Sequence, residues 1–547
     1  MIVIIYYGGN MQKQKNEIEL CDLKSNVTVL WSEKSCCEKE FKKNIVAGQE
    51  TFACFYGRIF DTKYTVEKLV FLFLNHQYQE IVHISGTISF ILIHNDITYV
   101  YTGNAYANPF YSYEQEGKIY ISDDFEAIAR KVKIAPTNQR IAALCWGANC
   151  LPYDDFTVLK TNSVYQINNE VELKWQHKTA EIKQKIKFDD TCFEARQYIE
   201  NAVASCLTGD KIALALSGGI DSSVLAICLK KLGADFECFH WTSNEFSPID
   251  ERQYAKELCD KYHIKLNLID IGEGIRNNNG YVNPDIEYYL PYNHGSFYWW
   301  EKTVKAATEK GCKVLFSGLN GDGLFSAPFS LIQFKDIFGE NFIWKMKSWW
   351  NSFGLPDRNL FQMDNDKTKR SIFEYLFLRR AEFISENYLQ EISKCNKEEV
   401  FIQRESLRIN LFSRYGIECI NPYLDQKLIE FCSGIPKYFK SIPVSGVIVQ
   451  KPVLKKAFKD ELPFAIYARN SKSNFGILSQ KFCNINRNYI YDCLNKESEL
   501  KSKGIIIENK FIDILKDENK LNQNAYSLIR SCFIEYWLKQ RKDDKYD

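Results

Sequence analysis

Residues 211–224 (KIALALSGGIDSSV) have the composition of a phosphate-binding turn between a strand and a helix. The apolar residues 212–216 predict a strand, and a helix is expected to begin at Ser222. Glycines between them let backbone N–H groups close on an anion, and the helix N-terminus adds donors and a positive dipole. No Gly-Lys-Ser/Thr sequence follows, so this is not a common P-loop. Asp221 suits Mg²⁺ held beside phosphates, because this cation prefers carboxylate and phosphate oxygens.

A second loop with similar chemistry occupies residues 317–325 (SGLNGDGLF) and contains Asp322. A lone Gly-Asp-Gly sequence is typical of a simple turn, so the meaning of this loop depends on its neighbours. Strands are predicted at residues 212–216, 236–241, 265–269 and 313–316, and helices at residues 222–232, 249–262 and 295–310. This alternation is typical of a doubly wound α/β parallel sheet, whose ligands bind beyond the carboxyl ends of the strands. We therefore expect both loops to face one pocket, with Asp221 and Asp322 clamping Mg²⁺.

The regions on either side of this sheet have different patterns. Residues 1–180 predict an α+β domain, with strands at residues 2–7, 26–30, 87–93, 98–102, 118–122 and 163–167 and helices at residues 66–75 and 125–131. The charged residues 181–192 are expected to form a solvated linker. Helical patterns dominate after residue 327, which predicts an all-α C-terminal extension. We expect two domains, at residues 1–180 and 181–547.

Composition limits the classes of partner and compartment. With 547 residues and a formal net charge of +1, the chain has no basic field to attract nucleic acid or a membrane surface. It has no apolar run of membrane-spanning length, and residues 1–10 are typical of a strand rather than a signal peptide. The 18 cysteines are scattered without a Cys-x-x-Cys pair, so we expect reduced, mostly buried thiols rather than structural zinc. These features favour a cytoplasmic location.

The two loops carry a resemblance to a known family. Residues 217–222 resemble the pyrophosphate loop of N-type ATP pyrophosphatases, and residues 317–325 resemble the matching loop of the asparagine synthetase B family. Residues 415–425 (YGIECINPYLD) and 451–457 (KPVLKKA) are similar to further segments of that family. The resemblance implies an adenine nucleotide α-hydrolase-like sheet that uses ATP and Mg²⁺ to adenylate a carboxylate. The implied nucleotide site comprises Leu216, Ser217, Gly218, Gly219, Asp221, Ser222, Trp241, Thr242, Ser317 and Gly318, with Asp221 and Asp322 as metal ligands.

The first domain resembles a class II glutamine amidotransferase domain at residues 86–96, 108–111 and 121–123, which implies an Ntn-hydrolase-like fold. In those enzymes an N-terminal cysteine is the nucleophile, and its own α-amine can serve as the base. Here Met1 is followed by Ile2, and the first cysteine is Cys21. We therefore expect an inactive glutaminase, so that glutamine does not supply nitrogen.

Leu319 departs from the family in the second loop. Asparagine synthetases carry glutamate there, and β-lactam synthetase carries a tyrosine that takes a proton from the attacking nitrogen. Leucine cannot accept a proton, so either the base lies elsewhere or the amine arrives neutral. The resemblance assigns charge stabilisation to Lys472 and an acidic position facing the pocket to Glu405. The alternatives are a surface lysine and a helical ion pair between Glu405 and Arg408.

The resemblance favours ATP-dependent macrolactam formation on a ribosomal peptide precursor through an acyl adenylate, as in lasso peptide cyclases. The product would contain an isopeptide bond. A β-lactam synthetase-like or ammonia-dependent asparagine synthetase-like amide ligase remains an alternative, as does an inert nucleotide-binding assembly subunit. Expected partners are the precursor core peptide and, in addition, a leader-peptide recognition protein and a leader peptidase. Neither nucleic acid nor a membrane is expected as a partner.

Overall fold

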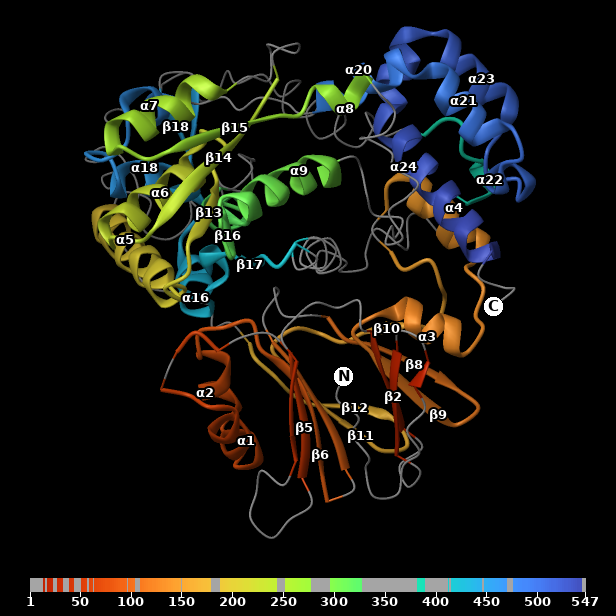
Figure 1. Ribbon diagram of the computed structural model, residues 1–547, viewed down its shortest axis with the longest axis horizontal. Helices are drawn as coiled ribbons and strands as arrows, with labels where there is room; N and C mark the ends of the chain where they lie inside the picture. Colours follow the sequence, from red (N-terminus) through yellow and green to blue (C-terminus); the bar gives the residue numbers. More distant parts are fainter. Residues whose placement is uncertain are drawn as a thin grey trace.

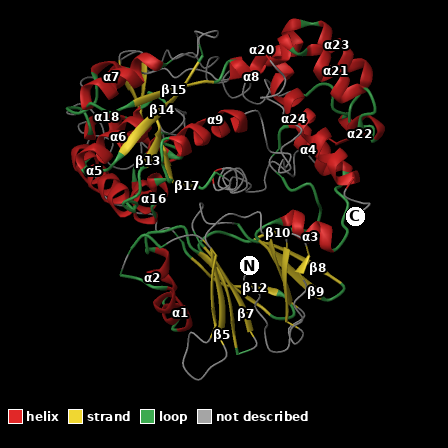
Figure 2. Cartoon of the chain, in the orientation of Figure 1, coloured by secondary structure: helices red, strands yellow, loops and turns green. Residues whose placement is uncertain are grey.

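The computed structural model has three regions (Figure 1): a β-rich N-terminal part, a parallel α/β sheet and a group of C-terminal helices. It describes residues 13–14, 17–22, 27–32, 39–43, 51–56, 59–61, 63–95, 97–103, 109–148, 150–178, 187–243, 251–276, 296–326, 381–388, 412, 415–444, 447–469 and 476–543. The strand predicted at residues 2–7 lies outside these ranges. Figure 2 shows that strands dominate the N-terminal part, whereas helices dominate the C-terminal group.

The N-terminal part is built from short strands and a few helices. The strands are β1 (Lys13–Gln14), β2 (Glu17–Asp22), β3 (Val27–Ser32), β4 (Lys39–Lys43), β5 (Thr51–Tyr56), β6 (Ser89–His94), β7 (Ile97–Thr102), β8 (Tyr111–Gln115), β9 (Lys118–Ser122), β10 (Thr157–Val158), β11 (Ser163–Ile167) and β12 (Val171–Gln176). The helices are α1 (Val66–Leu74), α2 (Tyr78–Val82), α3 (Phe125–Lys131) and α4 (Asn138–Trp146). Two six-stranded sheets result, with the orders β1-β2-β3-β9-β8-β10 and β12-β11-β7-β6-β5-β4.

The α+β character predicted for this part is confirmed. Strands β3, β6, β7, β9 and β11 match the predicted runs, and α1 and α3 match the predicted helices. Helix α1 begins where the hydroxyl of Thr65 accepts a hydrogen bond from the N–H of Lys68, and it packs Phe73 against Phe90 of β6. The prediction missed α2, α4 and the other strands, because short strands depend on pairing with distant segments more than on their own composition.

The second region is a parallel sheet with helices. Its strands are β13 (Ile212–Ala215), β14 (Phe236–Thr242), β15 (Leu266–Asp270), β16 (Val314–Ser317) and β17 (Glu418–Ile420). The helices along this stretch are α5 (Phe188–Ser205), α6 (Ile220–Lys231), α7 (Arg252–Tyr262), α8 (Glu273–Arg276), α9 (Ser296–Glu309) and α10 (Gly321–Phe325). The order β15-β14-β13-β16-β17 is parallel throughout and confirms the predicted sheet. The strand order reverses between β13 and β16, which is where ligands bind in such sheets.

The central strands are buried on both faces. Ala213 and Leu315 pack into a core shared with the C-terminal helices, whereas Leu214 and Phe316 pack into a second core with α5 and α6. Burial on both faces explains why these strands are nearly continuous apolar runs. The loops that follow β13 and β16 therefore start from a rigid base.

Two predictions about the flanking segments are wrong in part. Helix α5 begins at Phe188, so the predicted linker at residues 181–192 is helical from that residue onward. The region after residue 327 is not wholly helical, because β17 is the fifth strand of the parallel sheet and β18 (Ser441–Val444) pairs with β19 (Val447–Gln450). Three residues such as those of β17 carry no periodic signal, and only pairing with β16 makes them a strand.

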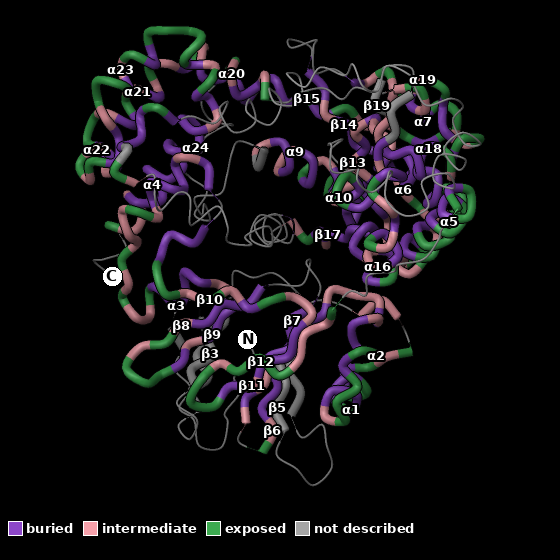
Figure 3. Tube along the Cα trace, turned by 180° about the vertical axis from the view of Figure 1, so that it is seen from behind, coloured by how far each residue is buried: buried purple, intermediate pink, exposed green. Residues whose placement is uncertain are grey.

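The remaining elements are mostly helical. They are η3 (Glu386–Tyr388), η4 (Pro422–Leu424), α16 (Gln426–Gly434), α17 (Lys437–Lys440), α18 (Pro452–Ala457), α19 (Phe464–Ala468), α20 (Gly476–Ile485), α21 (Arg487–Asn495), α22 (Glu499–Ser502), α23 (Glu508–Lys516) and α24 (Glu518–Asp543). Helix α24 packs against α4 of the N-terminal part, and Figures 1 and 3 show the two helices side by side, with buried stretches along both. Among the described helices, none has the length and apolarity needed to cross a membrane.

Candidate active site

The first loop connects β13 to α6 through closely spaced hydroxyl groups. The N–H of Ser217 donates to Oγ of Ser222 at 3.1 Å, and the N–H of Gly219 donates to Oγ of Ser217 at 3.2 Å. Gly218 has a φ of +74°, a left-handed conformation that side chains disfavour. Two serine hydroxyls and the N-terminal end of a twelve-residue helix thus surround the turn. Such a turn can receive an anion such as a phosphate group.

The second loop packs directly against the first. A Cβ added to Gly321 would lie 2.5 Å from Oδ1 of Asp221, and a Cβ added to Gly318 would lie 2.9 Å from the backbone N of Ser222. Neither distance is compatible with a side chain, so glycine is required at both positions for the loops to meet. The structure therefore brings the two predicted loops together at the carboxyl ends of β13 and β16.

Lys451 joins the two loops electrostatically. Its ammonium group forms ion pairs with the carboxylates of Asp221 and Asp322. Burial alone lowers the pKa of Lys451, but the two carboxylates outweigh this effect and raise the pKa above its ordinary value. The side chains of Lys451 and Asp221 are 8% and 10% exposed, whereas Asp322 is 68% exposed. The cluster therefore has one shielded carboxylate and one that opens to solvent.

The convergence of Asp221 and Asp322 on one cation fits the predicted magnesium site. Two carboxylates from separate strand ends share a position for positive charge, and hard oxygen ligands suit Mg²⁺. Within the described ranges, no cluster of three or more histidine, cysteine, aspartate or glutamate side chains is placed to hold a metal. Mg²⁺ at this position would therefore complete its shell with phosphate oxygens and water, as it commonly does.

A segment after β17 touches both loops from one side. The amide of Asn421 donates to the carbonyl of Leu319 at 2.9 Å and to Oγ of Ser317 at 3.4 Å. The hydroxyl of Tyr423, which is fully buried, donates to the carbonyl of Asp221 at 2.9 Å. Residues 421–423 therefore hold the backbone of each loop by a separate hydrogen bond.

A charged network supports the first loop from another side. A Cβ added to Gly218 would lie 3.0 Å from Cβ of Tyr254 and 3.3 Å from the backbone carbonyl of Glu251, so the start of α7 lies against the turn. Arg469 forms a buried ion pair with the carboxylate of Glu251, and its guanidinium lies 4.4 Å from the ring centre of Tyr254. Lys455 donates to the carbonyl of Arg469 at 2.7 Å, and burial lowers the pKa of Lys455 to about 8. The network fixes the chain just before residues 470–475.

The predicted site residues fall into three groups. The structure brings together the two loops, with the members Leu216, Ser217, Gly218, Gly219, Asp221, Ser222, Ser317, Gly318 and Asp322. Trp241 and Thr242 end the neighbouring strand β14, but the indole of Trp241 donates to Oγ1 of Thr303 and packs against Trp300. Lys472 and Glu405 lie outside the described residues, so their roles stay predictions.

Three residues of the site were missed as functional side chains by the sequence prediction: Lys451, Asn421 and Tyr423. A signal existed for Lys451. Its segment resembles the family, and Pro452, the residue after it, is typical of the first position of a helix. Asn421 and Tyr423 lie in another resembling segment, but the sequence does not reveal that their polar groups face the loops. Only the position of β17 beside β16 brings them there.

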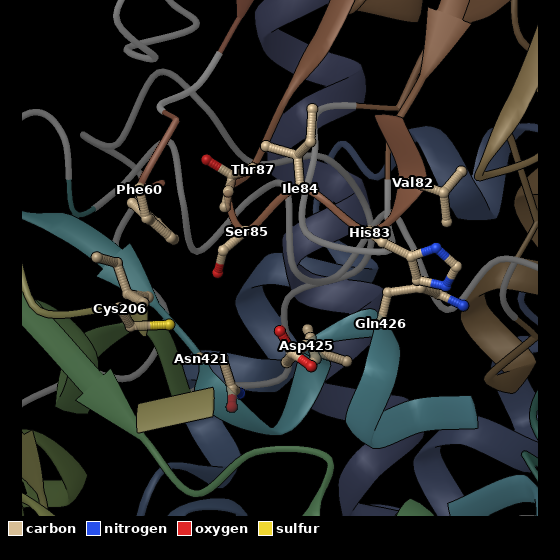
Figure 4. Close-up of a pocket in the computed structure, with 13 residues that line it drawn as sticks. Phe60, Val82, His83, Ile84, Ser85, Thr87, Cys206, Asn421, Asp425 and Gln426 are labelled. Carbon is tan, nitrogen blue, oxygen red and sulfur yellow. The ribbon is translucent and has the colours of Figure 1, made fainter. Parts of the chain in front are cut away.

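A small cavity of about 30 Å³ lies between the N-terminal part and the segment after β17. Figure 4 shows that its walls include His83 and Ser85 from the N-terminal part and Asn421, Asp425 and Gln426 from the segment after β17. Asn421 therefore lines this cavity and also binds the carbonyl of Leu319. The cavity is large enough to hold ordered water.

Comparisons with known proteins bear on the family of this chain. The family model described as asparagine synthase matches residues 194–539. A stretch of 68 residues is 40% identical to the microcin J25-processing protein McjC of Escherichia coli, and it covers 12% of this chain and 13% of that protein. The chain therefore matches far less than two thirds of the length of this relative.

Two solved structures are also similar. The NH3-dependent NAD synthetase of Campylobacter jejuni is 13% identical, with a TM-score of 0.21, over 40% of this chain and 96% of that one. The NMN synthetase of Francisella tularensis is 14% identical, with a TM-score of 0.20, over 39% and 94% of the two chains. The family model, in contrast, covers more than half of the chain and includes both loops. The chain therefore belongs to the asparagine synthase family.

Proposed function

We propose that this protein closes an amide bond within a peptide substrate, at the expense of ATP, as lasso peptide cyclases do. Family membership indicates an ATP-dependent amide ligase. The observation that carries the proposal is the convergence of Asp221 and Asp322 on one cationic position beside two glycine loops. The similarity to a microcin J25-processing protein supports a peptide substrate.

The proposed reaction has two steps. A substrate carboxylate attacks the α-phosphorus of ATP, and the bond to pyrophosphate breaks, which gives an acyl adenylate. An amine then attacks the acyl carbon, AMP leaves, and the nitrogen gives up a proton as the amide forms. Mg²⁺ held by Asp221 and Asp322 would offset the charge that develops on the leaving pyrophosphate.

The residues of this chain have distinct roles in the proposal. Backbone N–H groups of the first loop and the hydroxyls of Ser217 and Ser222 would bind phosphate oxygens. Lys451 would exchange its contact with the carboxylates for a contact with phosphate when Mg²⁺ and ATP enter together. Lys472 would stabilise charge at the reacting carbonyl. Asn421 would keep Leu319 and the second loop in place.

The amine is proposed to belong to the same peptide. Cys21, the first cysteine, lies within strand β2 and pairs with Thr28, which supports an inactive class II amidotransferase-like domain at residues 1–180 beside a synthetase domain at residues 181–547. Leu319 offers no proton acceptor, which favours an amine that is partly neutral at working pH, such as a peptide α-amine. A leader-peptide recognition protein and a leader peptidase are the proposed partners.

Pyrophosphate release tests the site. We expect Gly321→Ala to lower the rate at least about tenfold, because the new Cβ would displace the carboxylate of Asp221. Gly323→Ala is the matched control in the same short helix, since its Cβ would meet only the end of the Asn320 side chain. Equal rates for the two variants, or release that survives Asp221→Ala, would contradict the assignment.

Mass spectrometry tests the product. Linear peptides with a free N-terminus and an internal Asp or Glu are incubated with ATP and Mg²⁺, and the loss of one water together with AMP formation is expected. Amide formation only with free ammonia would favour the asparagine synthetase-like alternative, and cyclisation of a β-amino acid alone would favour the β-lactam synthetase-like one. ATP binding without pyrophosphate release for any carboxylate would indicate an inert assembly subunit.

A further inference from the structure

One carboxylate of the sheet region is bound by two histidines of the N-terminal part. Nε2 of His83 lies 2.9 Å from Oε1 and 3.1 Å from Oε2 of Glu430, and Nε2 of His177 lies 2.8 Å from Oε1. A carboxylate only accepts hydrogen bonds, so the ring of His83 donates through Nε2, whereas Nε2 of His177 contacts the carboxylate as an ion pair without a hydrogen bond. We call these three residues the His–Glu–His clamp.

The clamp is well ordered by its neighbours. The rings of His83 and His177 meet edge to face, with centroids 5.9 Å apart. His177 is 5% exposed, and its Nδ1 lies 3.2 Å from Oε1 of Gln79. The amide of Gln426 donates to Oε1 of Glu430 at 3.1 Å and accepts from Asn162 at 2.9 Å. The N-terminal part therefore contacts helix α16 at its first residue, Gln426, and at Glu430, one turn later.

Electrostatics agree with a carboxylate that stays ionised in the clamp. Burial alone raises the pKa of Glu430, but hydrogen bonds from Gln426 and His83 and the nearby charge of His177 outweigh it and lower the pKa. Charged groups that face this end of α16 include the carboxyl of Asp425 and the ammonium of Lys427. Breaking the clamp would leave a half-buried carboxylate with fewer donors, which disfavours the present position of α16.

Helix α16 leads directly to the ATP loops. Asp425 caps it by accepting from the N–H of Leu428 at 3.0 Å, and Asn421 and Tyr423 lie immediately before the cap. These two residues donate to the carbonyls of Leu319 and Asp221. A chain of contacts thus runs from the two histidines through α16 to both loops. Figure 4 shows His83, Gln426, Asp425 and Asn421 around the cavity described above.

We propose that His83 and His177 are positioning residues for the synthetase site: by holding Glu430 they set α16 and residues 421–423, and thereby the loop at residues 317–322. This inference rests on the proposed ATP site and gives the N-terminal domain a role that needs no glutaminase chemistry. The histidines touch neither loop and act only through α16. The domain is thus a scaffold for the second loop.

The test uses the full chain with the double variant His83→Ala/His177→Ala and the control His76→Ala, an exposed histidine that contacts Tyr78. We expect faster amide hydrogen exchange at residues 317–324 and 421–430, and an affinity for Mg-ATP that is weaker by roughly three- to tenfold. The variant His83→Gln/His177→Gln keeps an N–H donor near each Nε2 and should recover at least part of both effects. The control should match the wild type.

The outcomes separate this inference from the proposed function. If the wild type fails to bind Mg-ATP, the proposed function is wrong, whereas the exchange measurement still reports on the clamp. If the wild type binds Mg-ATP and the double alanine variant matches it in affinity and in exchange at residues 317–324, the positioning role is overturned. A lower melting temperature with unchanged exchange in the loop would also overturn it, because the clamp would then be structural only.

Discussion

At the scale of single residues, the site depends on buried cations. Lys451 adopts a left-handed conformation, with a φ of 55°, at the start of α18, and it faces two carboxylates from separate loops. Lys455, one turn later, donates to the carbonyl of Arg469, and burial lowers its pKa. The two lysines of one helix thus have pKa values shifted in opposite directions, because only Lys451 gains enough negative charge to offset burial.

The lowered pKa of Lys455 predicts a dependence of stability on pH. An unfolded lysine titrates near 10.4, whereas Lys455 titrates at about 8 in the folded chain. Below about pH 8 this lysine is protonated in both the folded and the unfolded state, so folding carries the full cost of burying its charge. Between about pH 8 and 10.4 the unfolded state binds more protons than the folded state, so the free energy of unfolding rises with pH. Relative to Lys455→Met, the wild type should gain up to about 2 kcal/mol between pH 7.5 and 9.5 in urea unfolding.

Lys456→Met is the matched control for this titration. Lys456 is the adjacent residue of the same helix, its side chain is 39% exposed, and it pairs with Asp189. The difference in unfolding free energy between this variant and the wild type should stay constant over the same pH range. A constant difference for Lys455→Met as well would show that Lys455 is not desolvated.

At the scale of elements, the decisive piece is the short segment between β17 and α16. It reaches the loop after β16 through Asn421 and the loop after β13 through Tyr423. Parallel strands end at one edge of the sheet, so a segment that leaves the neighbouring strand can touch both loops at once. The geometry of the site is therefore set by three strand ends rather than by the two loops alone.

Tyr423→Phe tests this segment. The change removes one hydrogen bond to the carbonyl of Asp221 and keeps the ring, so about 1 kcal/mol of stability and a several-fold loss in ATP affinity are expected. Tyr415→Phe is the control, because its hydroxyl donates to Glu301, away from the loops. Calorimetric titration with Mg-ATP compares the two variants. A weaker affinity in both, or in neither, would argue against a specific role for Tyr423.

At the scale of the whole molecule, the described residues of the N-terminal part contact both the sheet region and the C-terminal helices. The His–Glu–His clamp joins this part to α16, and α4 packs against α24. Near the end of α24, Arg541 contacts the carboxylate of Glu126 and the hydroxyl of Tyr153, and it donates to the carbonyl of Ile134. A single apolar core contains residues of α3, α4 and α24, so we expect cooperative unfolding.

Arg541→Gln tests this cooperativity. The variant leaves the buried carboxylate of Glu126 without its cation and should cost about 2 kcal/mol. In differential scanning calorimetry, we expect one transition for the wild type and a separate, earlier transition of the N-terminal part for the variant. Lys542→Gln is the control, because its neighbouring, 63% exposed side chain pairs with Glu499 inside the C-terminal group. Indistinguishable traces for both variants would refute this coupling.

The sequence was sufficient for the central sheet and its loops. Residues 212–216 and 313–316 are apolar runs followed by glycines, and such runs between helices specify buried parallel strands whatever their partners are. The meeting of the two loops followed from strand direction alone, since parallel strands present their carboxyl ends at one edge. The role of Trp241 was harder to predict. The partner of its indole depends on which helix covers that side of the strand, and here that helix is α9.

The sequence by itself determined that two glycine loops with two carboxylates meet at the end of a parallel sheet. Only the tertiary structure decided which other side chains contact these loops or position them. They are Lys451, which pairs with both carboxylates, Asn421 and Tyr423, which bind the loop carbonyls, and the two histidines that hold α16. The physical reason is the distance along the chain between the interacting residues. Strands and turns follow from the chemistry of neighbouring residues, whereas an ion pair between residues 221 and 451, or between residues 83 and 430, exists only once distant segments are packed together.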